Sequence, residues 1–312
     1  MEPAPPFRLD LTVWVLRRRA QNVWDRWDGQ TYRRVLAAGC GPVEVAVSQT
    51  GPPDTPRLRV VGASVKLPPD ATAIITSALE RLLGIRTDLN KFYEMAGADL
   101  YLAPLVQAYR GFKPPRYLSL FEALVNAISC QQLTLTVGVV LLNRISERYG
   151  AAFPSGNPGA HAFPRPEDLA GSDVEALRAM GFSRQKSVAI LGLARAVTDD
   201  GLDLSSLEFM DDETALKALL RLRGIGRWTA EYVLLRGIGR LHIFPGDDVG
   251  GRNNLQHWLH LPGPLDYEGV ERAVRPWQPF AGLLYFHLLL DRLADAGHIE
   301  AFTEPNVGGT AV

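Results

Sequence analysis

Residues 220–248 constrain the fold of this chain more than any other segment. They read LRLRGIGRWTAEYVLLRGIGRLHIFPGDD. Gly224 and Gly226 permit backbone geometry that a Cβ atom forbids, so they predict a tight turn that opens directly into a helix with an apolar face. Successive backbone amides at such a turn, together with the N-terminus of the following helix, bind an anion. The segment predicts a phosphate site, with an ordinary helix–turn–helix corner as the alternative.

The charge around this turn favours DNA as the source of the phosphate. The whole chain has a net charge of -1, which gives no overall attraction to nucleic acid. Residues 216–240, in contrast, contain many basic side chains and one acid, Glu231. Phosphate contacts position DNA without reading its sequence, because phosphates carry no base identity. The basic residues of this cluster are Lys217, Arg221, Arg223, Arg227, Arg236 and Arg240.

A second motif, residues 243–252, reads IFPGDDVGGR. Pro245 and Gly246 predict a turn, and Asp247 or Asp248 then lies at or near the N-cap of the next helix. In one interpretation both acids only cap that helix. In the other, a carboxylate at a fixed distance from a phosphate site indicates an enzyme that acts on a nucleotide within a nucleic-acid chain.

Composition narrows the class of protein and its compartment. The chain has 312 residues, enough for two or three modules, and its 46% hydrophobic and 21% charged content is typical of a globular protein. Cys40 and Cys130 are the only cysteines, which excludes a four-cysteine iron–sulfur cluster within this chain and fits a reducing compartment. The N-terminus lacks a signal pattern, and no apolar run reaches about eighteen residues. We expect a cytoplasmic protein, associated with the nucleoid if it is bacterial, and no membrane contact.

The chain is expected to be mainly α-helical with an N-terminal α+β domain over residues 1–110. Strand-like runs at 7–16, 31–37, 43–48 and 57–61 are separated by turn signals. From about residue 70 the pattern is helical, and a long helix is expected over 118–149. Residues 151–166 form a Pro/Gly/Ala-rich connector, and 301–312 are expected to be a tail.

Together, the turn, the intervening helix, the Gly/Pro-containing loop and the aspartate resemble the helix-hairpin-helix (HhH-GPD) DNA glycosylases. Members of that superfamily end this arrangement in a Gly/Pro-rich loop and a catalytic aspartate, which aligns with Asp248 and makes Asp247 its neighbour. The resemblance implies the HhH-GPD glycosylase fold, with all-helical domains over 111–300 and an active site between two helical lobes. Residues 1–110 resemble more loosely the N-terminal domain shared by AlkA-type and 8-oxoguanine glycosylases.

Three further segments resemble the AlkA-type alkylpurine glycosylases. Residues 121–134 resemble the long helix whose break lies against DNA at the gap left by an extruded nucleotide, with Gln132 at the wedge position; the alternative is an amide that satisfies a helix kink. Residues 180–186 resemble a helix start that contacts phosphate, or form a plain Ser N-cap with a solvated lysine. Residues 275–281 resemble a segment containing Arg-Pro-Trp. The residues expected to contact DNA are Gly224, Ile225, Gly226, Arg227, Thr229, Gln131, Gln132, Ser183 and Lys186.

One position distinguishes two kinds of glycosylase. Bifunctional members carry a lysine two residues after the second glycine of the hairpin, where its amine attacks the sugar; this chain has Trp228 there. The resemblance therefore implies a monofunctional hydrolase. Trp228 and Tyr232 are one helical turn apart, so both are expected to line the base pocket, with Trp277 as a further aromatic wall. For all three residues, core packing is the alternative.

The resemblance implies a monofunctional glycosylase that excises alkylated purines of the 3-methyladenine type from double-stranded DNA containing damaged bases. Asp248 would stabilise the oxocarbenium-like sugar, and aromatic rings would bind a cationic base. The alternatives are a glycosylase for oxidised or deaminated purines and a non-catalytic helix-hairpin-helix DNA-binding protein. We expect a monomer without a catalytic cofactor or iron–sulfur cluster. A structural Na⁺ or K⁺ at the backbone carbonyls of Leu222 and Ile225 is also implied.

Overall fold

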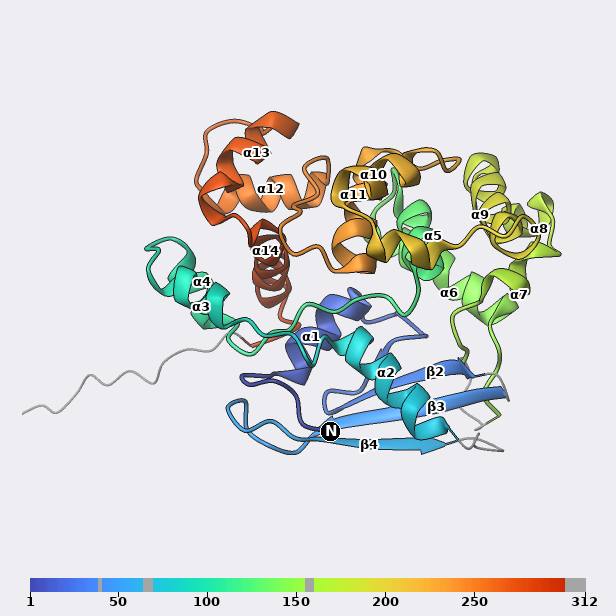
Figure 1. Ribbon diagram of the computed structural model, residues 1–312, viewed down its shortest axis with the longest axis horizontal. Coiled ribbons are helices and arrows are strands. Elements are labelled where there is room, and N and C mark those ends of the chain that lie inside the picture. Colours follow the sequence, from blue (N-terminus) through green and yellow to red (C-terminus); the bar gives the residue numbers. More distant parts are fainter. Residues whose placement is uncertain (39–40, 64–69, 155–159, 301–312) are drawn as a thin grey trace, which may run out of the picture.

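A computed structural model describes residues 1–38, 41–63, 70–154 and 160–300. Figure 1 shows an N-terminal sheet on one side of the molecule and two groups of helices on the other, with the first helix between them. The expected tail, residues 301–312, and Cys40 lie outside the described residues. The described part contains no helix that is long and apolar enough to cross a membrane.

The sheet is a four-stranded antiparallel meander in the order β1-β2-β3-β4. In β3 the burial alternates, and Val43, Val45 and Val47 all point to the same covered face. Helix α2, Ala71–Leu83, packs on this face through its buried leucines. The strands are β1 Arg26–Trp27, β2 Thr31–Ala38, β3 Gly41–Gln49 and β4 Leu58–Ala63.

The strand expected over residues 7–16 is wrong, because this segment forms helix α1, Leu9–Arg17. Its side chains pack on two sides. Leu9, Val13 and Leu16 belong to the core beneath the sheet, whereas Leu11 and Val15 belong to the core of the C-terminal helices. A helix that is buried all round shows little polar periodicity, and the β-branched and aromatic residues of a short apolar run then resemble a strand.

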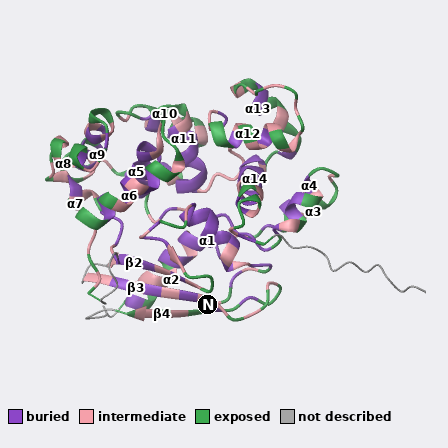
Figure 2. Cartoon of the chain, turned by 180° about the vertical axis from the view of Figure 1, so that it is seen from behind, coloured by how far each residue is buried: buried purple, intermediate pink, exposed green. Residues whose placement is uncertain are grey.

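The helices that follow the sheet form two lobes with separate cores. One core contains α5 to α11, and the other combines α3 and α4 with α12 to α14. Figure 2 shows that most of α1 and much of α14 are buried. The helices are α3 Asn90–Gly97, α4 Leu102–Ala108, α5 Leu120–Cys130, α6 Leu135–Tyr149, α7 Pro166–Ala170, α8 Val174–Ala179, α9 Arg184–Thr198, the 3₁₀ helix η1 Leu204–Phe209, α10 Asp212–Leu220, α11 Arg227–Val233, the π-helix η2 Leu234–Ile238, α12 Val249–Trp258, α13 Tyr267–Val274, the 3₁₀ helix η3 Arg275–Trp277 and α14 Ala281–Asp295.

The packing places a boundary earlier than residue 110. Leu89, Phe92, Leu102 and Leu105 share a core with α14, so α3 and α4 join the C-terminal lobe rather than the sheet. The order of elements along the sequence does not say which core an amphipathic helix joins, and the predicted boundary at 110 therefore does not follow the packing. Within the connector at 151–166, residues 155–159 lie outside the described part of the chain.

The continuous helix that periodicity predicts over 118–149 is wrong, because the chain forms two helices with a break at residues 131–134, where the resemblance implies one. Thr134 caps α6 by accepting a hydrogen bond from the Val137 amide. Gln132, in the break, adopts the left-handed conformation with φ 53°. The break projects a short exposed loop from the first lobe toward the second.

Candidate active site

A cleft of about 1360 Å³ lies between the two helical lobes. The loop between α5 and α6, together with α11, lines one side. The start of α12 and one face of α14 line the other, and Arg18 and Arg19, just after α1, complete the wall. Asp248, Trp228 and Tyr232 all line this cleft, together with Gln131 and Gln132. The structure therefore brings the main sequence-predicted site residues into one cavity.

Asp248 is both a helix cap and a cleft carboxylate. Its Oδ1 accepts a hydrogen bond from the Gly251 amide at 2.7 Å, which makes it the N-cap of α12. Its Oδ2 accepts from Trp228 Nε1 at 2.9 Å and from the Tyr285 hydroxyl at 3.2 Å. Burial and the neighbouring carboxylate raise the pKa of Tyr285 well above its ordinary value, so this hydroxyl remains a donor. Asp248 can therefore cap α12 with one oxygen and present the other to the cleft.

Glu231 stabilises the loop that carries Asp248 through two hydrogen bonds. Glu231 accepts hydrogen bonds from the Gly246 amide at 3.1 Å and from the Tyr267 hydroxyl at 2.7 Å, and burial raises its pKa. Asp247 forms an ion pair with Arg227, with Nε and Oδ2 2.7 Å apart. The guanidinium of Arg227 also lies 3.6 Å from the centroid of the Tyr267 ring. Asp247 thus has a cationic partner. Asp248 forms no ion pair with the described residues, and its carboxylate lines the cleft.

Trp228 and Tyr232 form an aromatic wall of the cleft, with ring centroids 5.5 Å apart. Trp277, in contrast, does not line the cleft, so its expected place in the base pocket is wrong. It is buried in the core of the second lobe, packs against Trp258 and donates to Asp99 Oδ2 at 2.9 Å. Core packing is the interpretation that holds for this residue. Tyr285 also contributes an aromatic side chain to the cleft. It lies on α14, far in sequence from the hairpin and the loop, so neither motif marks it.

Two buried arginines that sequence reasoning did not assign to the pocket lie beside Tyr232. Arg18 Nη1 donates to the Tyr232 hydroxyl at 3.2 Å, and that hydroxyl also shares a 2.7 Å hydrogen bond with Tyr117. The guanidinium of Arg236 lies 5.5 Å from the centroid of the Tyr232 ring. Both arginines line the cleft and are less than 5% exposed. Arg18 is some two hundred residues away in sequence from the motif, so only the fold reveals the contact.

The hairpin lies at the mouth of the cleft. Gly224 and Gly226 are exposed, whereas Ile225 is 8% exposed and packs into the first lobe. Gly224 has φ 82°, and a Cβ added there would lie 2.9 Å from the Ala189 Cβ. Thr229 is 1% exposed, and its Oγ1 accepts a hydrogen bond from Gln131 Nε2 at 2.9 Å.

Gln131 and Lys186 tie the helix break to its surroundings. Gln131 Nε2 donates to the Gly224 carbonyl and to Thr229 Oγ1, both at 2.9 Å. Lys186 Nζ donates to the carbonyls of Ser129 at 3.0 Å and Gln131 at 2.7 Å, and burial lowers its pKa. Ser183 caps α9, its Oγ accepting from the Lys186 amide at 3.3 Å. The amine of Lys186 is therefore not a solvated group, and of the two glutamines Gln132 is the one that is exposed.

The charged side chains that line the cleft are mostly basic. Asp247 and Asp248 are its acids, and its arginines are Arg18, Arg19, Arg227, Arg236 and Arg292. Among the described residues, no group of three or more His, Cys, Asp or Glu side chains is placed to hold a metal ion. A cation at the Leu222 and Ile225 carbonyls stays a prediction.

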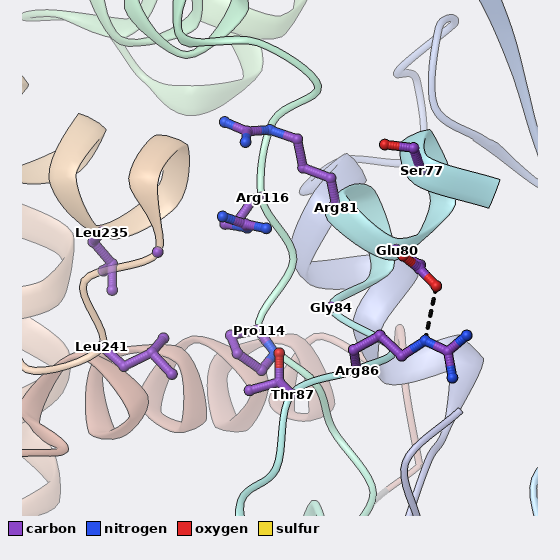
Figure 3. A pocket seen from close by; sticks show the side chains of 11 residues that line it. Ser77, Glu80, Arg81, Gly84, Arg86, Thr87, Pro114, Arg116, Leu235 and Leu241 are labelled. Atoms are coloured by element: carbon purple, nitrogen blue, oxygen red, sulfur yellow. Dashed lines mark hydrogen bonds and ion pairs between the residues drawn. The ribbon is translucent and has the colours of Figure 1, made fainter. Parts of the chain in front are cut away.

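A smaller cavity of about 500 Å³ lies between α2 and the chain after η2 and shares no lining residue with the cleft. Figure 3 shows Arg81, Arg86 and Arg116 around it. Arg86 pairs with Glu80 at 2.7 Å, and Arg81 Nε donates to the Tyr117 carbonyl at 2.7 Å. These arginines are engaged with the protein itself, and the cavity contains no second catalytic arrangement.

A family model described as HhH-GPD superfamily base excision DNA repair protein matches residues 125–279. A DNA-3-methyladenine glycosylase of Bacillus subtilis is 30% identical over 69% of this chain and 71% of its own length. The Escherichia coli DNA-3-methyladenine glycosylase 2 is 28% identical over 91% of this chain and 94% of its own length. A second B. subtilis relative, YfjP, is 31% identical, and this chain spans only 58% of its length.

Solved structures agree with these sequence matches. The 3-methyladenine DNA glycosylase from Archaeoglobus fulgidus has a TM-score of 0.82 and 26% identity, over 94% of this chain and 98% of that chain. The Schizosaccharomyces pombe 3-methyladenine DNA glycosylase, solved in complex with abasic DNA, has a TM-score of 0.55 and 28% identity, over 64% of this chain and 96% of that chain. The likeness to the first covers the sheet as well as both helical lobes.

Proposed function

This chain belongs to the HhH-GPD superfamily of base excision DNA repair proteins, and we propose that it is a monofunctional DNA glycosylase that hydrolyses the N-glycosidic bond of alkylated purines. The observation that carries the proposal is the Asp248 carboxylate, held in the cleft by an indole N–H and a phenol O–H. The names of the relatives, which are 3-methyladenine glycosylases, support the substrate class.

The proposed chemistry follows from the surroundings of Asp248. Cleavage of an N-glycosidic bond passes through a sugar with oxocarbenium character, and a fixed carboxylate stabilises its positive charge. Both oxygens of Asp248 accept hydrogen bonds from donors that are themselves held by the fold, so the charge is in place before the reaction. A water molecule supplies the nucleophile. Trp228 lacks the amine that a covalent sugar intermediate requires, which supports hydrolysis without lyase activity.

The target base must leave the DNA stack to reach Asp248. The cleft is large enough for an extruded purine, and Trp228 and Tyr232 offer it aromatic surface. In this proposal the amides around Gly224 and Gly226 bind a phosphate of double-stranded DNA, with Arg227 beside them. Gln132 enters the gap left by the base, since it is exposed and projects from the helix break at the mouth of the cleft.

The proposal is tested by incubating the protein with a duplex that contains a single alkylated purine. We expect free base, identified by mass spectrometry, and an intact strand with an abasic site that hot alkali then cleaves. Borohydride added during the reaction is expected to trap no covalent protein–DNA complex. Failure to release any base from a panel of damaged duplexes would contradict glycosylase activity, and a trapped complex would contradict the monofunctional assignment.

A further inference from the structure

Three consecutive residues of the loop that carries Asp248 are each contacted by a side chain of α11. Trp228 donates to Asp248 at 2.9 Å, and the acid before Asp248 pairs with Arg227. Glu231 accepts from the Gly246 amide at 3.1 Å. The ion pair is partly exposed, and such pairs contribute little, whereas Glu231 is 5% exposed. Of the two side chains that bind the loop without touching Asp248, Glu231 is therefore the buried one.

The other oxygen of Glu231 connects the same loop to α13. Its Oε1 accepts a hydrogen bond from the hydroxyl of Tyr267, the first residue of α13, at 2.7 Å. The ring of Tyr267 also packs against the loop, because a Cβ atom added at Gly246 would lie 2.7 Å from two of the ring carbons. The backbone at Gly246 thus contacts both a carboxylate and an aromatic ring, which leaves it little room to move.

Glu231 does not line the cleft, so it cannot contact an extruded base or its sugar. A glutamate is rarely buried unless its carboxylate is paired or hydrogen-bonded. Here one of its two hydrogen bonds goes to the loop itself and the other to the ring that packs against the loop. Asp248 follows two residues after Gly246, and a displacement of about 1 Å at a reacting group can lower a rate by about a hundredfold.

We infer that Glu231 is a positioning residue for base release. It fixes the loop backbone at Gly246 and joins the loop to α13 through Tyr267, and it thereby places the Asp248 carboxylate beneath the sugar. This inference rests on the proposed glycosylase function of the cleft. Loss of both hydrogen bonds displaces Asp248 but leaves the hairpin that binds DNA, so the rate of base release falls while the affinity for the duplex does not.

The test measures single-turnover base release and duplex affinity, with a duplex that contains one alkylated purine. In Glu231→Leu, which accepts neither hydrogen bond, the rate is expected to fall at least about tenfold and the dissociation constant to change by less than about twofold. In Glu231→Gln the amide oxygen still accepts from Gly246, so the rate is expected to stay within about threefold of the wild type.

Asp99→Leu is the control for Glu231→Leu. Asp99 also accepts from a backbone amide, that of Leu102 at 2.8 Å, and from an aromatic side chain, Trp277 at 2.9 Å, but it lies outside the cleft. This variant is expected to lose stability and to release the base at the wild-type rate. An equal fall in rate in Asp99→Leu and Glu231→Leu would overturn the inference.

A second comparison shows whether Glu231 acts through Asp248. In an Asp248→Asn background, Glu231→Leu is expected to lower the residual rate by less than about twofold, because the charge that it positions is already absent. The same factor in both backgrounds, or a fall in duplex affinity as large as the fall in rate, would overturn the inference and leave the glycosylase function standing. No base release by the wild type would overturn both.

Tyr267→Phe tests the same contact if Glu231→Leu fails to fold. The substitution keeps the ring against Gly246 and removes only the hydroxyl that donates to Glu231. The rate is expected to fall at least about threefold, with the affinity for the duplex unchanged. Tyr109→Phe removes a hydroxyl that donates to the Asp291 carboxylate at 3.0 Å, outside the cleft, and is expected to leave the rate unchanged. Equal rates in the two tyrosine variants would overturn the inference.

Discussion

The two oxygens of the Asp248 carboxylate have different surroundings. Oδ1 faces the first turn of α12 and accepts the Gly251 amide, while Oδ2 faces Trp228 and Tyr285. The helix N-terminus and both donors stabilise negative charge on this side chain. The Asp248 carboxylate is therefore a preorganised anion. The indole of Trp228 both lines the cleft and donates a hydrogen bond to this carboxylate.

Trp228→Phe tests this donor role. The substitution keeps an aromatic ring in the wall but removes the N–H that binds Oδ2. We expect the single-turnover rate of base release to fall about tenfold or more, because one preorganised hydrogen bond to the reacting carboxylate is lost. Trp277→Phe is the matched control, since it also removes an indole donor to a carboxylate, that of Asp99, outside the cleft. It is expected to lower the free energy of unfolding by about 1 kcal/mol and to leave the rate unchanged. Equal rates for Trp228→Phe and the wild type would contradict the donor role.

A residue's place in the cleft is predictable from the sequence only where the residue lies near a motif. Asp248, Trp228 and Tyr232 lie within or beside the hairpin and loop, and all three line the cleft. Arg18, just after α1, and Tyr285, on α14, reach the same cavity, and no local spacing marks them. Trp277 was assigned to the pocket because its segment resembled the family, yet its indole turns into the lobe core. Side-chain direction depends on tertiary packing, which a short motif does not contain.

At the scale of elements, the hairpin before α11 depends on one glycine more than on the other. Gly224 has φ 82° and an added Cβ would meet Ala189, whereas nothing lies within 4 Å of a Cβ added at Gly226. Gly224→Ala is expected to lower the free energy of unfolding by about 1–2 kcal/mol, because a side chain is strained in this conformation. Its affinity for duplex DNA is expected to fall with the loss of the turn. Gly226→Ala is expected to change stability by less than about 1 kcal/mol. Melting curves and DNA titrations of the pair check this, and equal effects would contradict it.

Helix α14 contains a group that makes stability depend on pH. His287 is 1% exposed, its Nδ1 lies 2.8 Å from the Leu283 carbonyl, and burial lowers its pKa to about 4. A lowered pKa stabilises the folded state above the ordinary value near 6.5, and this contribution is lost as the pH falls toward 4. The shift corresponds to about 3 kcal/mol. Denaturant unfolding at pH 7 and pH 4 is expected to show a smaller loss for His287→Leu than for the wild type. An identical loss in both proteins would be inconsistent with a buried neutral imidazole.

The sequence predicts which segments form helices and strands better than it predicts where they end or what they pack against. The turn, the Gly/Pro loop and most helices after residue 70 have caps or periodicity that local physics explains. Periodicity does not identify helix α1, because both of its sides are buried. It also predicts no break within residues 118–149, although the resemblance to AlkA-type glycosylases implies a break at Gln132. Whether α3 packs on the sheet or on α14 depends on contacts between distant residues, which periodicity cannot supply.

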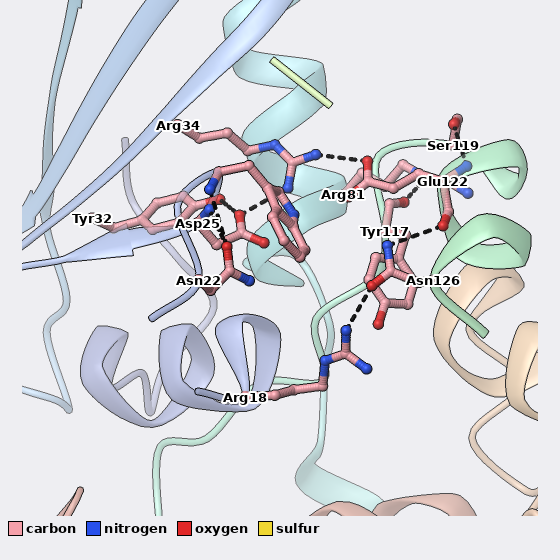
Figure 4. A network of polar contacts seen from close by, with 11 residues as sticks. Arg18, Asn22, Asp25, Tyr32, Arg34, Arg81, Tyr117, Ser119, Glu122 and Asn126 are labelled. Carbon is pink, nitrogen blue, oxygen red and sulfur yellow. Dashed lines mark hydrogen bonds and ion pairs between the residues drawn. The ribbon is translucent and has the colours of Figure 1, made fainter. Parts of the chain in front are cut away.

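At the scale of the whole molecule, a buried ionic network joins the sheet to the first helical lobe. Arg34 on β2 pairs with Asp25 at 2.8 Å and with Glu122 on α5 at 2.6 Å, and all three side chains are at most 3% exposed. Helix α5 also provides Asn126, the acceptor for Arg18 in the cleft. The sheet is thereby connected to the wall of the cleft through side chains (Figure 4).

Arg34→Met tests how much this connection stabilises the fold. The substitution leaves two carboxylates buried without their cation, so we expect the free energy of unfolding to fall by about 3–5 kcal/mol. Arg86→Met is the control, because its pair with Glu80 is largely exposed, and it is expected to cost less than about 1 kcal/mol. Chemical denaturation of both variants gives the comparison. A loss of similar size in the two would show that the buried network does not hold the sheet in place.

If the charge of Asp248 drives base release, two substitutions at neighbouring acids have very different effects. Asparagine caps a helix as well as aspartate does, so Asp248→Asn keeps α12 and its fold while removing the charge. Asp247→Asn makes the same change one residue earlier, in the acid that Arg227 already neutralises. With a duplex containing a single alkylated purine, we predict that base release falls at least about a hundredfold in Asp248→Asn, with duplex binding retained, and less than about threefold in Asp247→Asn. Wild-type release by Asp248→Asn, or equal losses in the two variants, would contradict the claim.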